Sequence, residues 1–187
     1  MKGRSNKKWQ FLIVTVLFLA CDNLFSPDEY KPSGNPFSLN SGIELLGIMS
    51  SDTLYSPSGA FTLELRVKAS SEKMDTLPAG LFFLSSDKGK KDMIIVKDFP
   101  IVASVSERIY VLPVFGVQRK REIPAETDYL FGPITDDPDL KPMVDILKRK
   151  RIEGRNVSLV QSAIYRITDG EELTQGLLDT LNNLPDE

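Results

Sequence analysis

The clearest alternation of apolar and polar residues runs from 61 to 69 (FTLELRVKA), where every second residue is apolar and most of the others are charged. Successive side chains of a strand point to opposite faces, so this pattern predicts a half-buried antiparallel strand. Pro113 lies in a further apolar run and places that run at a sheet edge or a bulge. The other expected strands are 43–49, 79–84 and 92–96 as a hairpin, and 109–117.

After Pro133 the apolar spacing changes from two residues to three and four. This spacing predicts an amphipathic helix over 139–149, a second helix capped by Asn156, and a third that starts at a capping box from Thr168 to Glu171. Short strands followed by helices predict an α+β fold, here an immunoglobulin-like antiparallel β-sandwich followed by two or three C-terminal helices.

The first 21 residues differ in kind from the rest of the chain. Four cationic side chains precede an apolar run over 11–20, which ends at Cys21. A helix needs about 20 apolar residues to span a bilayer, and this run has about half as many. A short apolar run behind positive charges is typical of a secretory signal.

The residues Phe18-Leu19-Ala20-Cys21 resemble the lipobox of bacterial lipoproteins, with Phe18 where that family usually has leucine. The resemblance implies cleavage after Ala20 and a diacylglyceryl group on the Cys21 thiol. Two or more acyl chains anchor a protein stably, whereas one gives only marginal binding. The alternative is an ordinary secretory signal that ends by chance at a cysteine.

We therefore expect three parts: a signal peptide (1–20), a lipidated cysteine with a proline-rich tether (21–40), and a single globular domain (41–187). Proline, glycine, serine and asparagine without apolar periodicity favour an extended, mostly disordered tether. Its aromatic residues are the exception, because they would shorten the tether if they packed on the domain: Phe25, Tyr30 and Phe37.

Composition excludes several classes of function. The chain has no histidine and one cysteine, which removes histidine-based catalysis and the usual histidine-containing zinc sites. Loss of residues 1–20 would remove four cationic side chains and no acidic one, so the formal net charge would move from −3 to −7. An acidic body does not favour nucleic-acid binding. We expect no cofactor and no metal.

Two basic clusters are candidate contacts for an anionic partner such as lipid headgroups, a glycan or an acidic protein surface. The first comprises Arg119, Lys120 and Arg121, and the second comprises Lys148, Arg149, Lys150 and Arg151, with Arg155 nearby. The alternative is that the second cluster complements a helix C-terminus and the rest are solvated loop charges.

Two groups of carboxylates are candidate sites. Asp136, Asp137 and Asp139 could bind calcium, but they lack the spacing of a calcium loop, and helix capping explains them more simply. Paired glutamates could hydrolyse glycosides, but nothing in the sequence brings any pair together, so solvent-facing charge is preferred for Glu64, Glu122 and Glu126.

The stretch 160–170 (VQSAIYRITDG) resembles the glutamine-bearing helix of thioester-containing bacterial surface adhesins. In that family the glutamine is joined to a cysteine from an earlier strand, and here the corresponding strand ends in Val114-Phe115-Gly116 without a cysteine. We therefore expect no thioester, and expect Gln161 to be buried and hydrogen-bonded to backbone.

These observations favour a cell-envelope lipoprotein, facing the periplasm or the cell exterior, with a non-catalytic binding domain. The alternatives are a structural component of envelope assembly and a carboxylate-based enzyme. A groove lined by aromatic residues would favour a glycan or peptide ligand, the candidates being Phe82, Phe83, Tyr110 and Tyr129. A flat exposed apolar patch would favour a protein partner.

Overall fold

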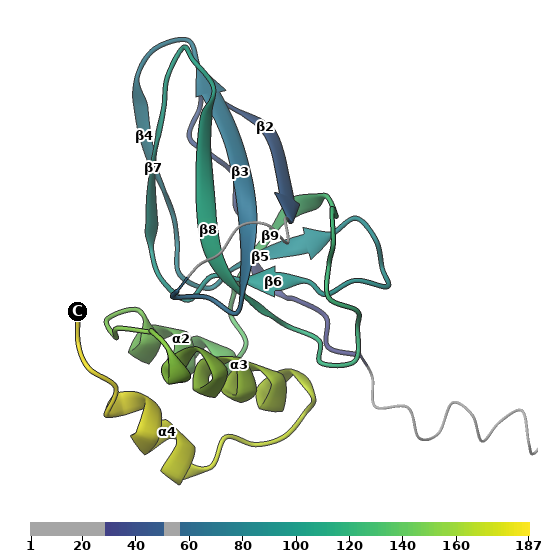
Figure 1. Ribbon diagram of the computed structural model, residues 1–187, viewed down its shortest axis with the longest axis vertical. Coiled ribbons are helices and arrows are strands. Elements are labelled where there is room, and N and C mark those ends of the chain that lie inside the picture. The colour runs from purple at the N-terminus through teal and green to yellow at the C-terminus, as the bar shows by residue number, and fades with distance from the viewer. Residues whose placement is uncertain (1–28, 51–56) are drawn as a thin grey trace, which may run out of the picture.

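The computed structural model describes residues 29–50 and 57–187 (Figure 1). The strands in these ranges are β1 (Gly34–Asn35), β2 (Ile43–Ser50), β3 (Phe61–Ala69), β4 (Lys73–Leu77), β5 (Leu81–Ser85), β6 (Met93–Ile94), β7 (Phe99–Ala103), β8 (Arg108–Gly116) and β9 (Tyr129–Thr135). The helices are α2 (Leu140–Leu147), α3 (Arg155–Thr168) and α4 (Gln175–Asn182). The predicted α+β class, with strands first and helices last, is confirmed.

Seven strands form one antiparallel sheet in the order β1-β9-β5-β6-β8-β3-β2. The predicted strand 61–69 is β3, and its inward side chains Leu63, Leu65 and Val67 are fully buried. The sheet curls until β2 approaches β9: the Ser50 amide donates to the Thr127 carbonyl at 2.9 Å, and Met49 forms a bridge with Asp128.

A second sheet, the ribbon of β4 and β7, lies beside β3 and β8 and gives the molecule a sandwich-like arrangement (Figure 1). Neither strand of this ribbon was predicted, and β1 and β9 were also missed. The Tyr110 hydroxyl on β8 accepts from the Val102 amide at 2.7 Å and donates to the Val102 carbonyl at 2.8 Å. One side chain thereby satisfies both backbone groups of a ribbon residue.

Strand β5 separates two cores. Phe83 points into the core between the curled sheet and the ribbon, with Leu81 on the same side. Phe82, between them in sequence, belongs to a second core shared with all three helices. Successive side chains of a strand point to opposite faces. A strand that lies between two cores therefore needs apolar residues on both faces, as β5 has.

The helices begin differently from the prediction. The residue before α3 is Gly154 and no side chain caps this helix, so Asn156, already within α3, was wrongly predicted as a cap. Thr168 is the last residue of α3, and its hydroxyl donates to the Val117 carbonyl. The capping box at Thr168 was therefore wrong as well, and α4 is capped by Thr174, whose side chain accepts from the Leu177 amide.

The predicted hairpin of β5 and β6 is confirmed, with Phe82 opposite Ile94. Pro113 faces Thr62 on β3, whereas β6 pairs with β8 only through Phe115 and Gly116. The missing amide of Pro113 therefore costs no pairing with β6, which explains how proline is accommodated in this strand.

Residues 29–40 fall in the segment predicted as a tether, and several of them contact the body. The Tyr30 hydroxyl donates to Asp137 at 3.2 Å. The Phe37 ring meets Phe131 edge-on with centroids 5.1 Å apart. Gly34 and Asn35 form β1 against the end of β9. Residues 1–20 and Cys21, with the predicted cleavage and lipidation sites, lie outside the described residues.

Candidate interaction surfaces

The two predicted basic clusters lie at opposite ends of α3. Arg119 pairs with Asp169, the residue that follows the C-terminus of α3, at 3.2 Å. The second cluster, Lys148 to Arg151, follows α2 and lies shortly before Arg155, the first residue of α3. A helix of 14 residues is about 20 Å long, so the clusters do not form one continuous basic surface.

In the first cluster, two of the three cations are paired within the chain. Arg121 binds Glu29 at 2.5 Å and Asp92 at 3.2 Å. The hydrogen bond from Arg121 lowers the pKa of Glu29. Arg119 is paired with Asp169, which leaves Lys120 as the fully solvated member. Most of this cluster holds the protein's own carboxylates.

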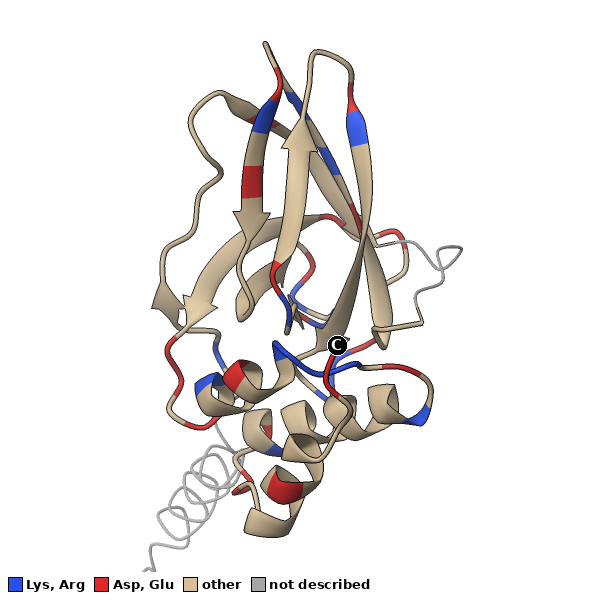
Figure 2. Cartoon of the chain, turned by 90° about the vertical axis from the view of Figure 1, so that its left-hand side faces the viewer, with Lys and Arg blue, Asp and Glu red and all other residues tan. Residues whose placement is uncertain are grey.

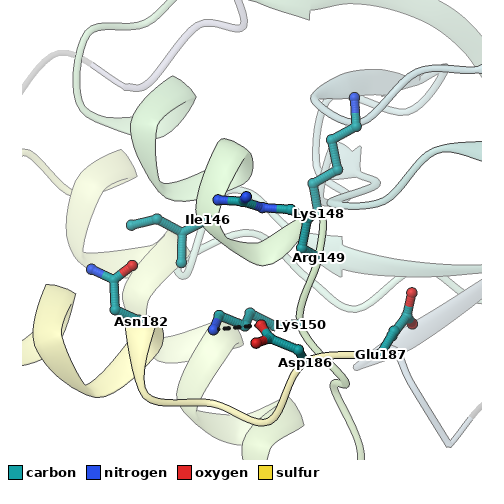
Figure 3. A pocket seen from close by; sticks show the side chains of 7 residues that line it. All are labelled: Ile146, Lys148, Arg149, Lys150, Asn182, Asp186 and Glu187. Atoms are coloured by element: carbon teal, nitrogen blue, oxygen red, sulfur yellow. Dashed lines mark hydrogen bonds and ion pairs between the residues drawn. The ribbon is translucent and has the colours of Figure 1, made fainter.

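The second cluster borders a hollow of about 600 Å³ between the end of α2 and the C-terminal segment (Figure 3). Lys148 binds Asp98 at 2.9 Å, and Lys150 binds Asp186 at 2.7 Å. Burial acts to raise the pKa of Asp98, but hydrogen bonds from Lys148 and from the Ala79 amide outweigh it and lower that pKa. Figure 2 shows both acidic and basic residues on the sheet and on the helices.

The aspartates before α2 act in local structure. One carboxylate oxygen of Asp137 accepts from the amides of Asp139 and Leu140, both at 2.9 Å, and the other accepts from Tyr30. Asp136 accepts from the Ser33 hydroxyl at 3.2 Å. These contacts agree with the capping interpretation. No group of three or more potential metal ligands occurs in the part of the chain that the structure describes.

The glutamates considered for glycoside hydrolysis are separate from one another. Glu64 lies on β3 and binds Arg66 at 2.5 Å. Glu122 lies in the loop between β8 and β9 and binds Lys90 at 2.5 Å. Glu126, in the same loop, has a positive φ of 48°. The described contacts give no two of them a shared partner.

Gln161 makes the contact that the sequence predicted, although its side chain is only partly buried. Its amide nitrogen donates to the Gly116 carbonyl at 2.8 Å, and its amide oxygen accepts from the Gly116 N–H at 2.9 Å. A Cβ at position 116 would lie 3.0 Å from both Lys91 and the Tyr165 hydroxyl. Glycine therefore lets α3 approach the end of β8 closely.

Sequence reasoning missed a buried polar cluster beside Gly116. Lys91 is 4% exposed and donates to the carbonyls of Gln118 and Arg119 at 2.6 and 2.7 Å. Burial lowers the pKa of Lys91. Asp92 accepts from Gln118 at 2.6 Å. These residues lie in polar loops of the sequence, and only the pairing of the two loops brings them together. Each contact is internal, so the cluster stabilises the loops.

The aromatic residues proposed for a ligand groove are not available to a ligand. Phe82 and Phe83 are fully buried, and Tyr129 is 2% exposed with its hydroxyl bound to the Lys91 carbonyl. Tyr110 is partly buried and bound to Val102. These residues build the cores instead of a groove.

An exposed apolar surface does occur on the outer face of β2, β3 and β8, here called the outer sheet face. Ile109 and Val111 lie on β8 opposite Arg66 and Glu64 of β3, and Met49 lies opposite Glu64 on the other side. The exposed fractions of Ile109, Val111 and Met49 are 54%, 39% and 37%. Apolar side chains thus flank the charged centre of the sheet on both sides.

The charged residues at the centre of the outer sheet face pair with one another, two cations with three carboxylates. Arg66 binds Glu64 at 2.5 Å and Glu107 at 3.8 Å. Lys68 binds Glu44 on β2 at 3.3 Å. A partner that covers this face would therefore meet paired charges together with exposed apolar side chains.

No family model, no curated protein and no solved structure matched this chain in the three comparisons. Across residues 29–50 and 57–187, every helix is too short or too polar to cross a bilayer.

Proposed function

We propose that this chain is a cell-envelope lipoprotein whose body is a non-catalytic module for binding another protein. The lipobox-like sequence at Phe18-Leu19-Ala20-Cys21 supports an acylated Cys21 as the membrane anchor. Such an anchor would hold the body on the periplasmic or the exterior side of a membrane. The absence of histidine and the separate placement of the three glutamates support a binding role over catalysis.

The observation that carries the choice of a protein partner is the outer sheet face. Its apolar side chains are exposed while the large aromatic residues are buried or tied to backbone. Exposed apolar surface favours a protein partner, whereas pockets for small ligands are concave and lined mainly by apolar and aromatic side chains. The ion pairs of Arg66 and Lys68 make this face less costly to cover than unpaired charges would.

The sandwich-like pairing of a large and a small antiparallel sheet supports a β-sandwich body. An immunoglobulin-like type stays a prediction. Those domains have two sheets of three or more strands each, whereas the strands within residues 29–50 and 57–187 divide seven and two.

The proposal is tested by capture from detergent-solubilised envelope of the producing cells. The acylated chain should retain a discrete partner, and the double variant Ile109→Glu/Val111→Glu should lose it, because two charges would be placed in the apolar contact. Met74→Glu is the matched control, since Met74 is 71% exposed on the ribbon and lies outside the outer sheet face.

Retention of the same partner by the double variant would contradict the use of this face. Intact mass of the native, membrane-extracted chain tests the anchor separately. An unmodified Cys21, or a mature N-terminus elsewhere, would contradict the lipoprotein part of the proposal without affecting the binding result.

A further inference from the structure

Residues 185–187 at the C-terminal end run antiparallel to residues 149–151 of the second basic cluster. The Arg151 amide donates to the Pro185 carbonyl at 2.7 Å, and the Glu187 amide donates to the Arg149 carbonyl at 3.1 Å. Between these bonds, Lys150 and Asp186 form an antiparallel bridge. Backbone pairing of this kind is how a sheet edge receives an extended peptide.

Two ion pairs add charge recognition to the backbone pairing. Lys150 binds Asp186 at 2.7 Å, as the dashed line in Figure 3 shows. Lys97, which follows β6 in the chain, binds Glu187. The two acidic residues of the segment thus meet lysines from two different parts of the body.

In these two ion pairs the lysines are more deeply buried than the acidic residues. The Lys150 side chain is 14% exposed and that of Lys97 is 23% exposed, whereas Asp186 and Glu187 are 76% and 60% exposed. The lysines are therefore built into the body, while the acidic segment lies on its surface. Leu184 is the last buried residue of the chain, so nothing after it is held by an apolar core.

The site continues beyond the segment that occupies it. Arg149 borders the hollow of about 600 Å³ next to Lys150. Lys150 lowers the pKa of Asp186 through its hydrogen bond and its charge, and the charge of Arg149 adds to this effect, but among the described residues Arg149 has no carboxylate within ion-pair distance. An acidic peptide longer than three residues could therefore pair with residues 149–151 and place a further carboxylate near Arg149. The carboxylates of Asp186 and Glu187 are largely exposed, so water can replace their contacts and those of the paired backbone when the chain's own segment leaves.

We propose that residues 149–151, together with Lys97, form a docking site for an extended acidic segment of a partner protein. In the free chain Pro185–Glu187 occupies this site and competes with the partner. This surface is distinct from the outer sheet face, and the inference does not depend on lipidation of Cys21.

The test uses the full chain in detergent and a fluorescein-labelled peptide of sequence NNLPDEEE, followed by fluorescence anisotropy. The variant Asp186→Asn/Glu187→Gln removes the charges of the competing segment and should bind the peptide about 10-fold more tightly than the unchanged chain. Adding Lys150→Met should abolish this gain. Lys141→Met, which removes an exposed lysine of α2, should preserve it.

A neutral peptide, NNLPNQQQ, should bind none of these proteins measurably. The proposal is overturned if the double variant, with an unchanged circular dichroism spectrum, binds NNLPDEEE no more tightly than the unchanged chain. Equal losses from Lys150→Met and Lys141→Met would also overturn it, because binding would then be non-specific charge attraction. Dimers formed by exchange of residues 185–187 would identify a second copy, and not a partner protein, as the occupant.

Discussion

At the scale of single residues, two side chains satisfy the backbone of a neighbouring element in the same way. Gln161 binds the N–H and the carbonyl of Gly116, and the Tyr110 hydroxyl binds the N–H and the carbonyl of Val102. A buried backbone group left without a partner costs about 1–3 kcal/mol. Both side chains are therefore expected to join elements that have few backbone bonds to each other.

Gln161→Ala should lower the free energy of unfolding by about 1–3 kcal/mol, because both bonds to Gly116 are lost. The matched control is Gln175→Ala, since the Gln175 amide binds only the exposed Asp179 and should change stability by less than about 0.5 kcal/mol. Urea unfolding followed by circular dichroism measures both. Equal effects would show that the contact with Gly116 contributes nothing specific.

Tyr110→Phe keeps the ring that packs on Phe99 and removes only the hydroxyl. It should cost about 1–2 kcal/mol and increase hydrogen exchange at Val102. Tyr165→Phe is the control, because no described hydrogen bond uses the Tyr165 hydroxyl. If exchange at Val102 were unchanged in Tyr110→Phe, the ribbon would be held by packing alone.

At the scale of elements, two features can be tested: the residues that begin the helices, and the contacts that hold the N-terminal segment on the body. Thr174 caps α4, whereas α3 starts at Gly154 without a side-chain cap. Glu29 and Tyr30 fix the N-terminal segment through Arg121 and Asp137. These are surface contacts of modest energy, so they can be tested one at a time without unfolding the body.

Thr174→Ala should destabilise the protein by about 1 kcal/mol, because the Leu177 amide loses its side-chain acceptor and keeps only the Thr174 carbonyl. Asn156→Ala should have an effect of less than about 0.5 kcal/mol, since Asn156 lies inside α3 and caps nothing. Thermal unfolding of the two variants compares them directly. A larger loss of stability from Asn156→Ala than from Thr174→Ala would support the cap at Asn156 that the sequence pattern predicted.

The Glu29–Arg121 pair should make part of the stability depend on pH. The hydrogen bond from Arg121 lowers the pKa of Glu29, so the pair stabilises the folded state above the ordinary glutamate pKa of about 4.3. This contribution is lost as the pH falls through the lowered pKa of the folded state. The difference in free energy of unfolding between the unchanged chain and Glu29→Gln should therefore be constant from about pH 5 to 8 and vanish in more acidic solution. A difference that grew on acidification would contradict the ion pair.

At the scale of the whole molecule, the helices cover one end of the sheet and leave the outer face of β2, β3 and β8 open (Figure 1). Phe82 explains this division, because it points from β5 into the core shared with the helices. Among residues 29–50 and 57–187, no helix covers the side chains of Ile109 and Val111, which are 54% and 39% exposed. The layered arrangement thus leaves one sheet face free for contact with another molecule.

The sequence predicted the elements that carry strong periodicity and missed those that depend on distant partners. β3 alternates clearly, and α2 and α3 present apolar residues at helical spacing, so their existence followed from local pattern. β4 (KMDTL) and β7 (FPIVA) are short, and each is stabilised by the other across 21 intervening residues. Their individual sequences hold too little pattern to identify a strand.

The sequence predicted which residues form the candidate sites, but not which other residues they contact. The basic run after α2 was evident, yet its pairing with residues 185–187 depends on how α4 returns the chain to α2. Likewise the apolar run 109–117 predicted a strand, but only the structure shows that Ile109 and Val111 within it are exposed. Gln161 was expected to bind backbone, and the structure identified Gly116 as the residue it binds.

The central claim is that an envelope-anchored body binds another protein through its outer sheet face, and photo-crosslinking in producing cells tests it most directly. A photoreactive phenylalanine analogue at position 109 should form a discrete adduct with one protein, whereas the same group at the exposed position 141 on α2 should not. The adduct from position 109 should disappear when Val111→Glu is added. No adduct at position 109, or the same adduct from both positions, would contradict the claim.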